Sequence, residues 1–412
     1  MKIPDGTATM PRSGIRAVMA LALLKPGCIR LELGEPDFAT PANIVEAAHR
    51  AALNGQTKYT ATAGLPVLRE ALSAKIAERN GFDIAADRIL VSTGAVEGIY
   101  ASLVGLVEPG DGVLIPEPGW PNYRMMTRLL RARAQSYQLR PDMGYLPDVD
   151  ELETLVDRGT KAIVLNSPSN PTGAVIPAER MSALLDFAAR HDLWVVSDEC
   201  YDELTYDVPH VSAATLDDRD AVISVFSFSK TYAMTGWRIG YVAVPKRVGE
   251  VLANMHEAMA SCVAMPTQMA ALEAVIGPQH AVESMRSAYR DRRDAVLARL
   301  SARGIPAHVP DGAFYVWLDV SAAEMDSHQL ATRLVEEHGV AVAPGSAFGA
   351  GGGDRVRLSI AASQVDLLEG VDRISRALSD AAQPIPKGST LDGQGAPARS
   401  GTVLTPTAHP VR

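Results

Sequence analysis

Short apolar segments recur along the first two thirds of the chain, and stretches with helical spacing separate them. The segments are rich in β-branched residues, which predicts strands buried on both faces. Strands that alternate with helices predict a mostly parallel sheet with helices on both sides. The predicted strands are residues 88–92, 112–116, 161–166, 193–197, 221–226 and 240–244.

The N-terminal part of the chain predicts two helices and one half-exposed strand. Residues 13–24 predict a short helix, and apolar positions alternate over residues 29–33 as in a strand. Residues 41–53 predict a second helix, with Thr40 as its cap and Pro41 as its first residue.

The C-terminal part predicts a second, smaller α/β unit. Residues 247–303 have helical spacing, and strands follow at 311–318, 340–345 and 354–360. Residues 363–378 close the unit as a helix with one apolar stripe.

These patterns divide the chain into four predicted regions. Residues 1–40 are expected to join the small domain, 41–285 to form a large domain, and 286–382 to form the small domain. Residues 383–412 are rich in Pro, Gly, Ser and Thr, which predicts a disordered tail.

Composition and charge exclude several classes of function. The 412 residues carry a net charge of −9, which argues against nonspecific nucleic-acid binding. No segment is long and apolar enough to span a membrane. Three cysteines lie far apart without metal-like spacing, so we expect a reducing, cytoplasmic compartment and no metal site.

Residues that can bind or react follow four of the predicted strands. Gly94, Asn170 and Asp198 follow three of them, and Ser227 and Lys230 follow the fourth. The carboxyl ends of parallel strands meet at one edge of a sheet, where such folds bind ligands. A glycine turn, an amide, a carboxylate and a lysine gathered there suit a phosphorylated, nitrogen-containing ring that bears an aldehyde.

Lys230 is the central candidate for the chemistry. A lone lysine beyond a strand is most often a surface residue, but this one lies between hydroxyl groups and Arg238. A Schiff base requires an uncharged amine, and the pKa of a free lysine is about 10.4. Desolvation and a nearby cation such as Arg238 both lower that pKa.

Several short motifs resemble those of the class I aminotransferases, in the large aspartate/aromatic group. Residues 227–238 match the lysine motif S-x-S-K-x-x-x-x-x-G-x-R, and G-E-P-D-F occupies residues 34–38. N-P-T-G at 170–173 and R-L-S at 357–359 follow in the family's order. The resemblance implies fold type I of the pyridoxal-phosphate transferases: a large domain with a mostly parallel, seven-stranded-type sheet sandwiched by helices, and a smaller α/β domain.

The resemblance also implies an activity. A pyridoxal-phosphate-dependent aminotransferase moves the amino group of an L-amino acid to a 2-oxo acid through a Schiff base on the motif lysine, here Lys230. The family works as a homodimer, and the tyrosine matched by Tyr59 contacts the cofactor of the partner subunit. The amino donor and the 2-oxo acceptor stay undetermined.

Roles for the site residues follow from the same resemblance. Catalysis would rest on Lys230, on Asp198 against the pyridine nitrogen, and on Tyr201 against the ring oxygen. Further cofactor contacts would come from Gly94, Ala95, Val96, Trp120, Asn170, Ser227, Arg238 and the partner's Tyr59. The substrate would contact Gly34, Trp120, Asn170 and Arg357.

Two positions leave the motifs ambiguous. Ala95 and Val96 lack the polar side chains that family members often carry there, so backbone amides would have to hold the phosphate. Arg355 and Arg357 share one face of a strand, so spacing alone cannot choose between them, and the resemblance selects Arg357.

Three other functions stay open. A pyridoxal-phosphate-dependent lyase or oxidase of a biosynthetic pathway would use the same lysine and arginine. A nicotinamide dehydrogenase would need a dinucleotide fingerprint, which is missing. A non-catalytic regulator would need a DNA-binding segment, and none is appended to this fold.

Overall fold

The structure is a computed structural model that describes residue 10 and residues 13–381. Its largest sheet has seven strands in the order β2-β8-β7-β6-β5-β3-β4. Only β8 runs antiparallel to its neighbours, so the predicted mostly parallel sheet is confirmed. The strands are β2 (Ile89–Ser92), β3 (Gly112–Glu117), β4 (Arg133–Gln138), β5 (Thr160–Asn166), β6 (Trp194–Asp198), β7 (Val222–Ser227) and β8 (Gly240–Ala243).

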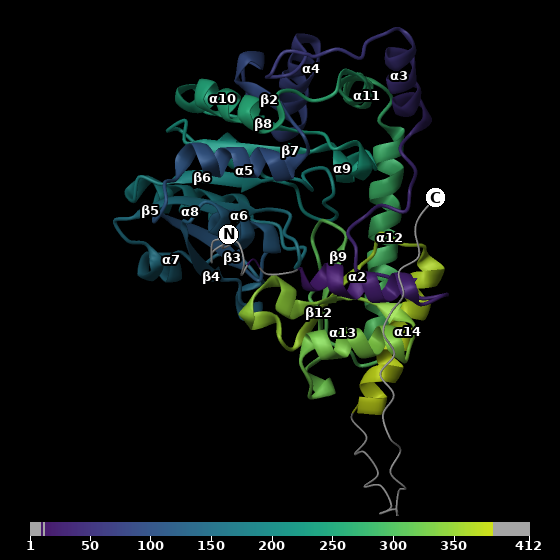
Figure 1. Cartoon of the computed structure of the whole chain (residues 1–412). Coiled ribbons are helices and arrows are strands. Elements are labelled where there is room, and N and C mark those ends of the chain that lie inside the picture. The colour runs from purple at the N-terminus through teal and green to yellow at the C-terminus, as the bar shows by residue number, and fades with distance from the viewer. Residues whose placement is uncertain (1–9, 11–12, 382–412) are drawn as a thin grey trace, which may run out of the picture.

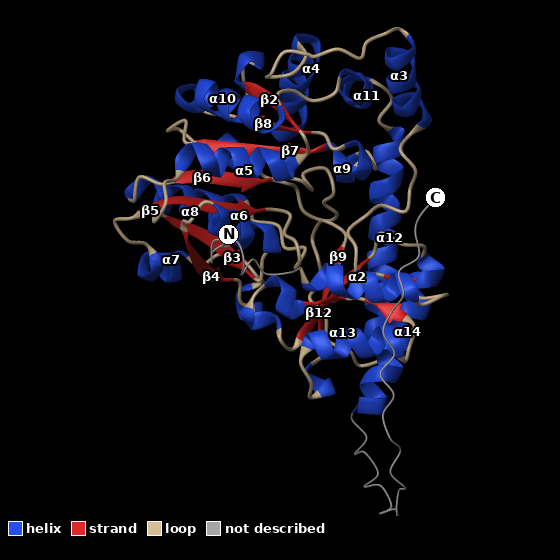
Figure 2. Cartoon of the chain, viewed as in Figure 1, coloured by secondary structure: helices blue, strands red, loops and turns tan. Residues whose placement is uncertain are grey.

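Helices cover both faces of this sheet (Figures 1 and 2). In β5, Ala162 and Val164 pack into the core on one face, whereas Ile163 and Leu165 pack into the core on the other. A strand buried on both faces needs a continuous apolar run, which is why these strands could be predicted. The helices around the sheet are α3 (Ala42–Leu53), α4 (Pro66–Lys75), α5 (Ala95–Leu106), α6 (Pro121–Leu129), α7 (Val149–Leu155), α8 (Ala178–Arg190), α9 (Phe228–Thr231), α10 (Gly249–Ala260) and α11 (Met265–Ile276).

Two small sheets lie beyond one end of the large sheet. One is antiparallel and has the order β11 (Ala343–Pro344), β12 (Arg355–Ser359), β9 (Tyr315–Asp319). The other pairs β1 (Ile29–Arg30) in parallel with β10 (Val340–Ala341). One apolar core joins them to α2 (Gly14–Leu24), α12 (His280–Ala302), α13 (Ser327–Glu336) and α14 (Gln364–Ala381).

The long helix α12 links the two parts of the molecule (Figure 1). The predicted domain boundary after residue 285 falls inside this helix, and the division into domains stays a prediction. The predicted tail, residues 383–412, lies outside the described residues. Within residues 13–381, no helix combines the length and apolar character needed to cross a membrane.

Some predicted elements differ from the structure. The strand expected over 29–33 is confined to β1, and the one expected over 340–345 is split into β10 and β11, which pair with different partners. Thr40 does not cap α3, because its hydroxyl donates to the Ala233 carbonyl at 2.6 Å and Pro41 precedes the helix instead. β4 was not predicted, because its sequence R-A-Q-S-Y-Q is mostly polar and largely half-buried.

Candidate active site

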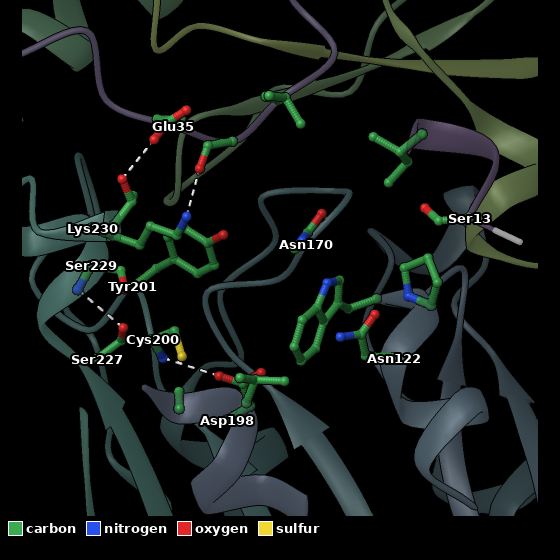
Figure 3. Close-up of a pocket in the computed structure, with 18 of the residues that line it drawn as sticks. Ser13, Glu35, Asn122, Asn170, Asp198, Cys200, Tyr201, Ser227, Ser229 and Lys230 are labelled. Carbon is green, nitrogen blue, oxygen red and sulfur yellow. Dashed lines mark hydrogen bonds between the residues drawn. The ribbon is translucent and has the colours of Figure 1, made fainter. Parts of the chain in front are cut away.

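A cavity of about 750 Å³ lies at the carboxyl ends of the parallel strands and extends to β9 and β12. Figure 3 shows Lys230, Tyr201, Asp198 and Asn170 around it. The strand order therefore brings together side chains that are far apart in sequence, as expected for such a sheet. The predicted site residues on its wall are Gly34, Ala95, Val96, Trp120, Asn170, Asp198, Tyr201, Ser227, Lys230, Arg238 and Arg357.

Lys230 projects from α9, the short helix that follows β7. Its Nζ donates a hydrogen bond to the carbonyl of Gly34 at 2.5 Å (Figure 3). The pKa of Lys230 is lowered to about 8, chiefly by burial; the positive charges of Arg357 and Arg238 contribute to the lowering, while Cys200 and Glu35 oppose it. An appreciable fraction of this amine is therefore uncharged near neutral pH.

Asp198 ends β6 and is 4% exposed. Its Oδ2 accepts from the hydroxyl of Tyr123 at 2.5 Å, and its Oδ1 accepts from the backbone N–H of Cys200 at 3.2 Å. Burial raises the pKa of Asp198, and these hydrogen bonds act against that rise. Sequence reasoning did not assign Tyr123 to this carboxylate.

Tyr201 and Tyr315 form a hydroxyl pair on the side of the cavity nearest the small sheets. The two oxygens lie 2.7 Å apart, and both side chains are buried. A Cβ on Gly34 would lie 1.8 Å from the Tyr315 hydroxyl, so any side chain at this position would require the Tyr315 ring to move. Tyr315 is a second residue that the motifs did not reveal.

Arg357 is buried in β12 and points into the cavity. Its Nη1 donates to Asn170 Oδ1 at 2.8 Å, and its Nη2 donates to the carbonyl of Glu32 at 2.6 Å. The guanidinium also lies 4.2 Å from the centre of the Tyr315 ring. Arg355 instead pairs with Asp319 at 2.5 Å outside the cavity. The structure therefore distinguishes the two arginines, which the sequence spacing alone could not do.

The turn from β2 into α5 forms another corner of the cavity. Gly94 has φ +83°, and a Cβ on it would lie 2.4 Å from Nη2 of Arg238. Ala95 and Val96 are the first residues of α5, so their N–H groups have no acceptor inside the helix. Gly240 backs this corner, because a Cβ there would lie 2.7 Å from the Ala95 nitrogen.

Ser227 and Trp120 complete the predicted set within this chain. Ser227 caps α9, and its Oγ accepts from the backbone N–H of Ser229 at 3.1 Å (Figure 3). Trp120 meets Tyr123 edge to face, with ring centres 5.4 Å apart. Tyr59 is not brought to the cavity of its own chain, and it is 90% exposed.

Comparison with known proteins identifies the class to which this fold and cavity belong. The family described as aminotransferase class I and II matches residues 26–374. The chain belongs to this family and is a pyridoxal-phosphate-dependent aminotransferase, so the expected fold, activity and cofactor are confirmed. The matches favour transamination over the lyase and oxidase alternatives.

Individual relatives are similar over nearly their whole length. The aspartate/prephenate aminotransferase of Thermus thermophilus is 39% identical over 367 residues, 88% of this chain and 94% of that protein. The aspartate aminotransferase of Pyrococcus horikoshii is 37% identical over 380 residues, 91% of this chain and 97% of that protein. A solved Thermus thermophilus aspartate aminotransferase mutant, complexed with tryptophan, has a TM-score of 0.88 at 37% identity and matches 92% of this chain and 100% of its own.

The cavity fits this cofactor chemically. Asp198 is a buried carboxylate, and its hydrogen-bond donors among the residues that the structure describes, Tyr123 and Cys200, are neutral. A protonated ring nitrogen would supply the missing positive charge. Lys230 offers a partly uncharged amine for an aldehyde. The first N–H groups of α5, together with Arg238, suit a phosphate.

Proposed function

We propose that Lys230 is the covalent anchor of the cofactor aldehyde and the base that moves the α-proton of the amino acid. The observation that carries this proposal is the lysine beyond the end of β7 whose pKa is lowered to about 8. When bound, pyridoxal phosphate supplies an aldehyde that condenses with amines and a protonated ring that withdraws electrons from the α-carbon. Once released by the substrate amine, Nζ of Lys230 takes the proton from the α-carbon.

Asp198 and Tyr201 tune the ring in this proposal. The carboxylate of Asp198 holds a proton on the ring nitrogen, because an opposite charge at close range favours the charged form. Tyr201 donates its hydroxyl to the ring oxygen, and Trp120 stacks on the ring. Supporting this assignment, burial and the neighbouring hydroxyl of Tyr315 raise the pKa of Tyr201, so it keeps its proton at neutral pH.

Arg357 binds the α-carboxylate of the substrate in this proposal, with Asn170 and Gly34 beside it. A guanidinium fork matches a carboxylate with two hydrogen bonds. Among the described residues, Nε of Arg357 is buried without a hydrogen-bond partner. A substrate carboxylate would supply an acceptor of the right charge.

Lys230 is tested through the visible absorption of the purified protein. Wild type should show a long-wavelength band that an effective amino donor converts to the pyridoxamine form, whereas Lys230→Ala should lack both the starting band and turnover. Lys230→Arg serves as the matched control, because it keeps a positive charge but cannot form the covalent link. A wild-type protein without the band after addition of pyridoxal phosphate would refute the proposal.

An acidic amino donor, such as aspartate, is the substrate class we propose. Similar proteins carry the names aspartate and aspartate/prephenate aminotransferase. Arg16 of α2 lines the cavity, and among the described residues no carboxylate lies within ion-pair distance of it. With Lys230, Arg238 and Arg357 assigned to the aldehyde, the phosphate and the α-carboxylate, Arg16 is left for a second carboxylate. An aromatic donor is the rival, since one relative is named aromatic-amino-acid aminotransferase 2.

We further propose a homodimer in which Tyr59 contacts the cofactor phosphate of the partner subunit. Tyr59 is 90% exposed and does not line the cavity of its own chain. The adjacent Thr60 accepts from Gln268 Nε2 at 2.9 Å, which fixes the segment that carries Tyr59.

A cytoplasmic location is favoured by the three unpaired cysteines.

A further inference from the structure

Glu97 folds back onto the turn that leads from β2 into α5. Its Oε2 accepts from the backbone N–H of Thr93 at 3.0 Å and lies 3.4 Å from the Thr93 hydroxyl. Glu97 is the third residue of α5, and Gly94 precedes the helix. The carboxylate thereby ties the first turn of the helix to the residue that enters it, much as a capping box does.

The other oxygen of Glu97 is held by a buried histidine on α10. Oε1 lies 2.8 Å from Nδ1 of His256, a residue that is 3% exposed. Within the described residues, Nε2 of His256 has no hydrogen-bond partner, so Glu97 is the polar contact of this ring. A Cβ on Gly105 would lie 2.6 Å from Leu252 Cδ2, so α10 sits close against α5.

This arrangement matters because the adjacent corner must bind phosphate through its backbone. Ala95 and Val96 offer no polar side chain, and their N–H directions depend on how the turn over residues 93–96 is set. Hydrogen-bond energies weaken steeply when such donors are misaligned. Glu97 does not line the cavity, so it can act on a bound phosphate only through the turn.

We propose that Glu97, held in place by His256, is a positioning residue for the backbone amides that receive the cofactor phosphate. This rests on the proposed function, in which residues 94–96 and Arg238 bind that phosphate. A plain helix cap would stabilise the fold equally with any ligand. A positioning residue instead affects the phosphate-bearing ligand selectively.

The test compares the dissociation constants of pyridoxal phosphate and of pyridoxal, which lacks the phosphate, by equilibrium dialysis of the full-length protein. Glu97→Ala should weaken pyridoxal phosphate binding about tenfold, the effect of misaligning one charge-assisted hydrogen bond between the turn and the phosphate, and leave pyridoxal binding within about twofold. Glu97→Gln keeps an acceptor for the Thr93 N–H, so its affinity for pyridoxal phosphate should be closer to that of wild type than to that of Glu97→Ala. Glu250→Ala, an exposed carboxylate on α10, is the matched control.

Equal losses for the two ligands, or no loss in Glu97→Ala, would overturn the positioning role. If Glu97→Ala does not fold, His256→Asn replaces it, because it removes the contact that holds Glu97 and should give the same selective loss to a smaller extent. Equal or absent losses in that variant also overturn the proposal. Wild type that fails to bind pyridoxal phosphate would refute the proposed function and this role together, whereas wild-type binding with an unaffected Glu97→Ala refutes only the role of Glu97.

Discussion

The hydroxyl of Tyr123 donates to Oδ2 of Asp198 across 2.5 Å, although the two residues lie 75 positions apart in sequence. Burial and the charge of Asp198 raise the pKa of Tyr123, so the phenol stays protonated and keeps donating. The bond favours the ionised form of a carboxylate that burial would otherwise protonate. Tyr123 thus opposes the rise in the pKa of Asp198 that burial causes.

Replacement of Tyr123 by Phe should therefore weaken pyridoxal phosphate binding. A hydrogen bond to a buried charge contributes about 1.5–3 kcal/mol, so we expect a loss of about tenfold or more in affinity. Tyr137→Phe is the matched control, because its hydroxyl donates at 2.8 Å to the carbonyl of Val164, away from the cavity. Equal losses in both variants, measured by equilibrium dialysis, would contradict the role of Tyr123.

Lys230 should react with the cofactor in a pH-dependent way. Its pKa is lowered to about 8 in the folded protein, so the fraction of Lys230 with an uncharged amine increases as pH rises through that value. The rate at which cofactor-free protein forms its covalent adduct with pyridoxal phosphate should rise from about pH 6.5 and level off by about pH 9.5. Stopped-flow absorbance measures this rate, and a midpoint near that of free lysine would show that burial does not activate Lys230.

Arg357 and Arg355 should differ sharply when each is replaced by Ala. Loss of the Arg357 fork should weaken binding of the amino donor by about 1.5–3 kcal/mol, as expected for charge-assisted hydrogen bonds. Arg355 pairs with Asp319 outside the cavity, so its loss should leave donor affinity within about twofold of wild type. Half-reaction titrations followed by absorbance give these affinities, and unchanged donor affinity in Arg357→Ala would count against its role.

Arg16 should determine whether an acidic donor is preferred. Arg16→Gln should lower kcat/KM for aspartate about tenfold through loss of one ionic hydrogen bond, and leave kcat/KM for phenylalanine within about twofold. Arg128→Gln, on α6 and not on the cavity wall, controls for a change in net charge. A parallel fall for both donors would exclude recognition of a second carboxylate.

Tyr59 should act across a dimer. Tyr59→Ala and Lys230→Ala, each in a separate chain, are expected to be impaired alone at limiting cofactor. Co-refolding the two should restore activity, because one site of the mixed dimer then contains a native lysine and the partner's native tyrosine. Light scattering checks for the dimer, and a failure of the mixture to regain activity would argue that Tyr59 serves its own chain or none.

Much of the fold and the cavity could be predicted because of how the large sheet is buried. Strands covered on both faces need continuous apolar runs, and residues after such strands meet at one edge. β4 escaped prediction because an edge strand tolerates polar residues. Tyr123 and Tyr315 were not assigned because each finds its hydroxyl partner, Asp198 or Tyr201, only through the tertiary fold.

Gly240 has a further consequence for the phosphate corner that it backs. Because Gly240 has no side chain, the backbone of β8 packs directly against the first backbone amide of α5. Few side-chain rotamers at this contact become restricted when an anion binds. Association then loses little conformational entropy at this point, since most of the ordering is complete once the sheet has folded.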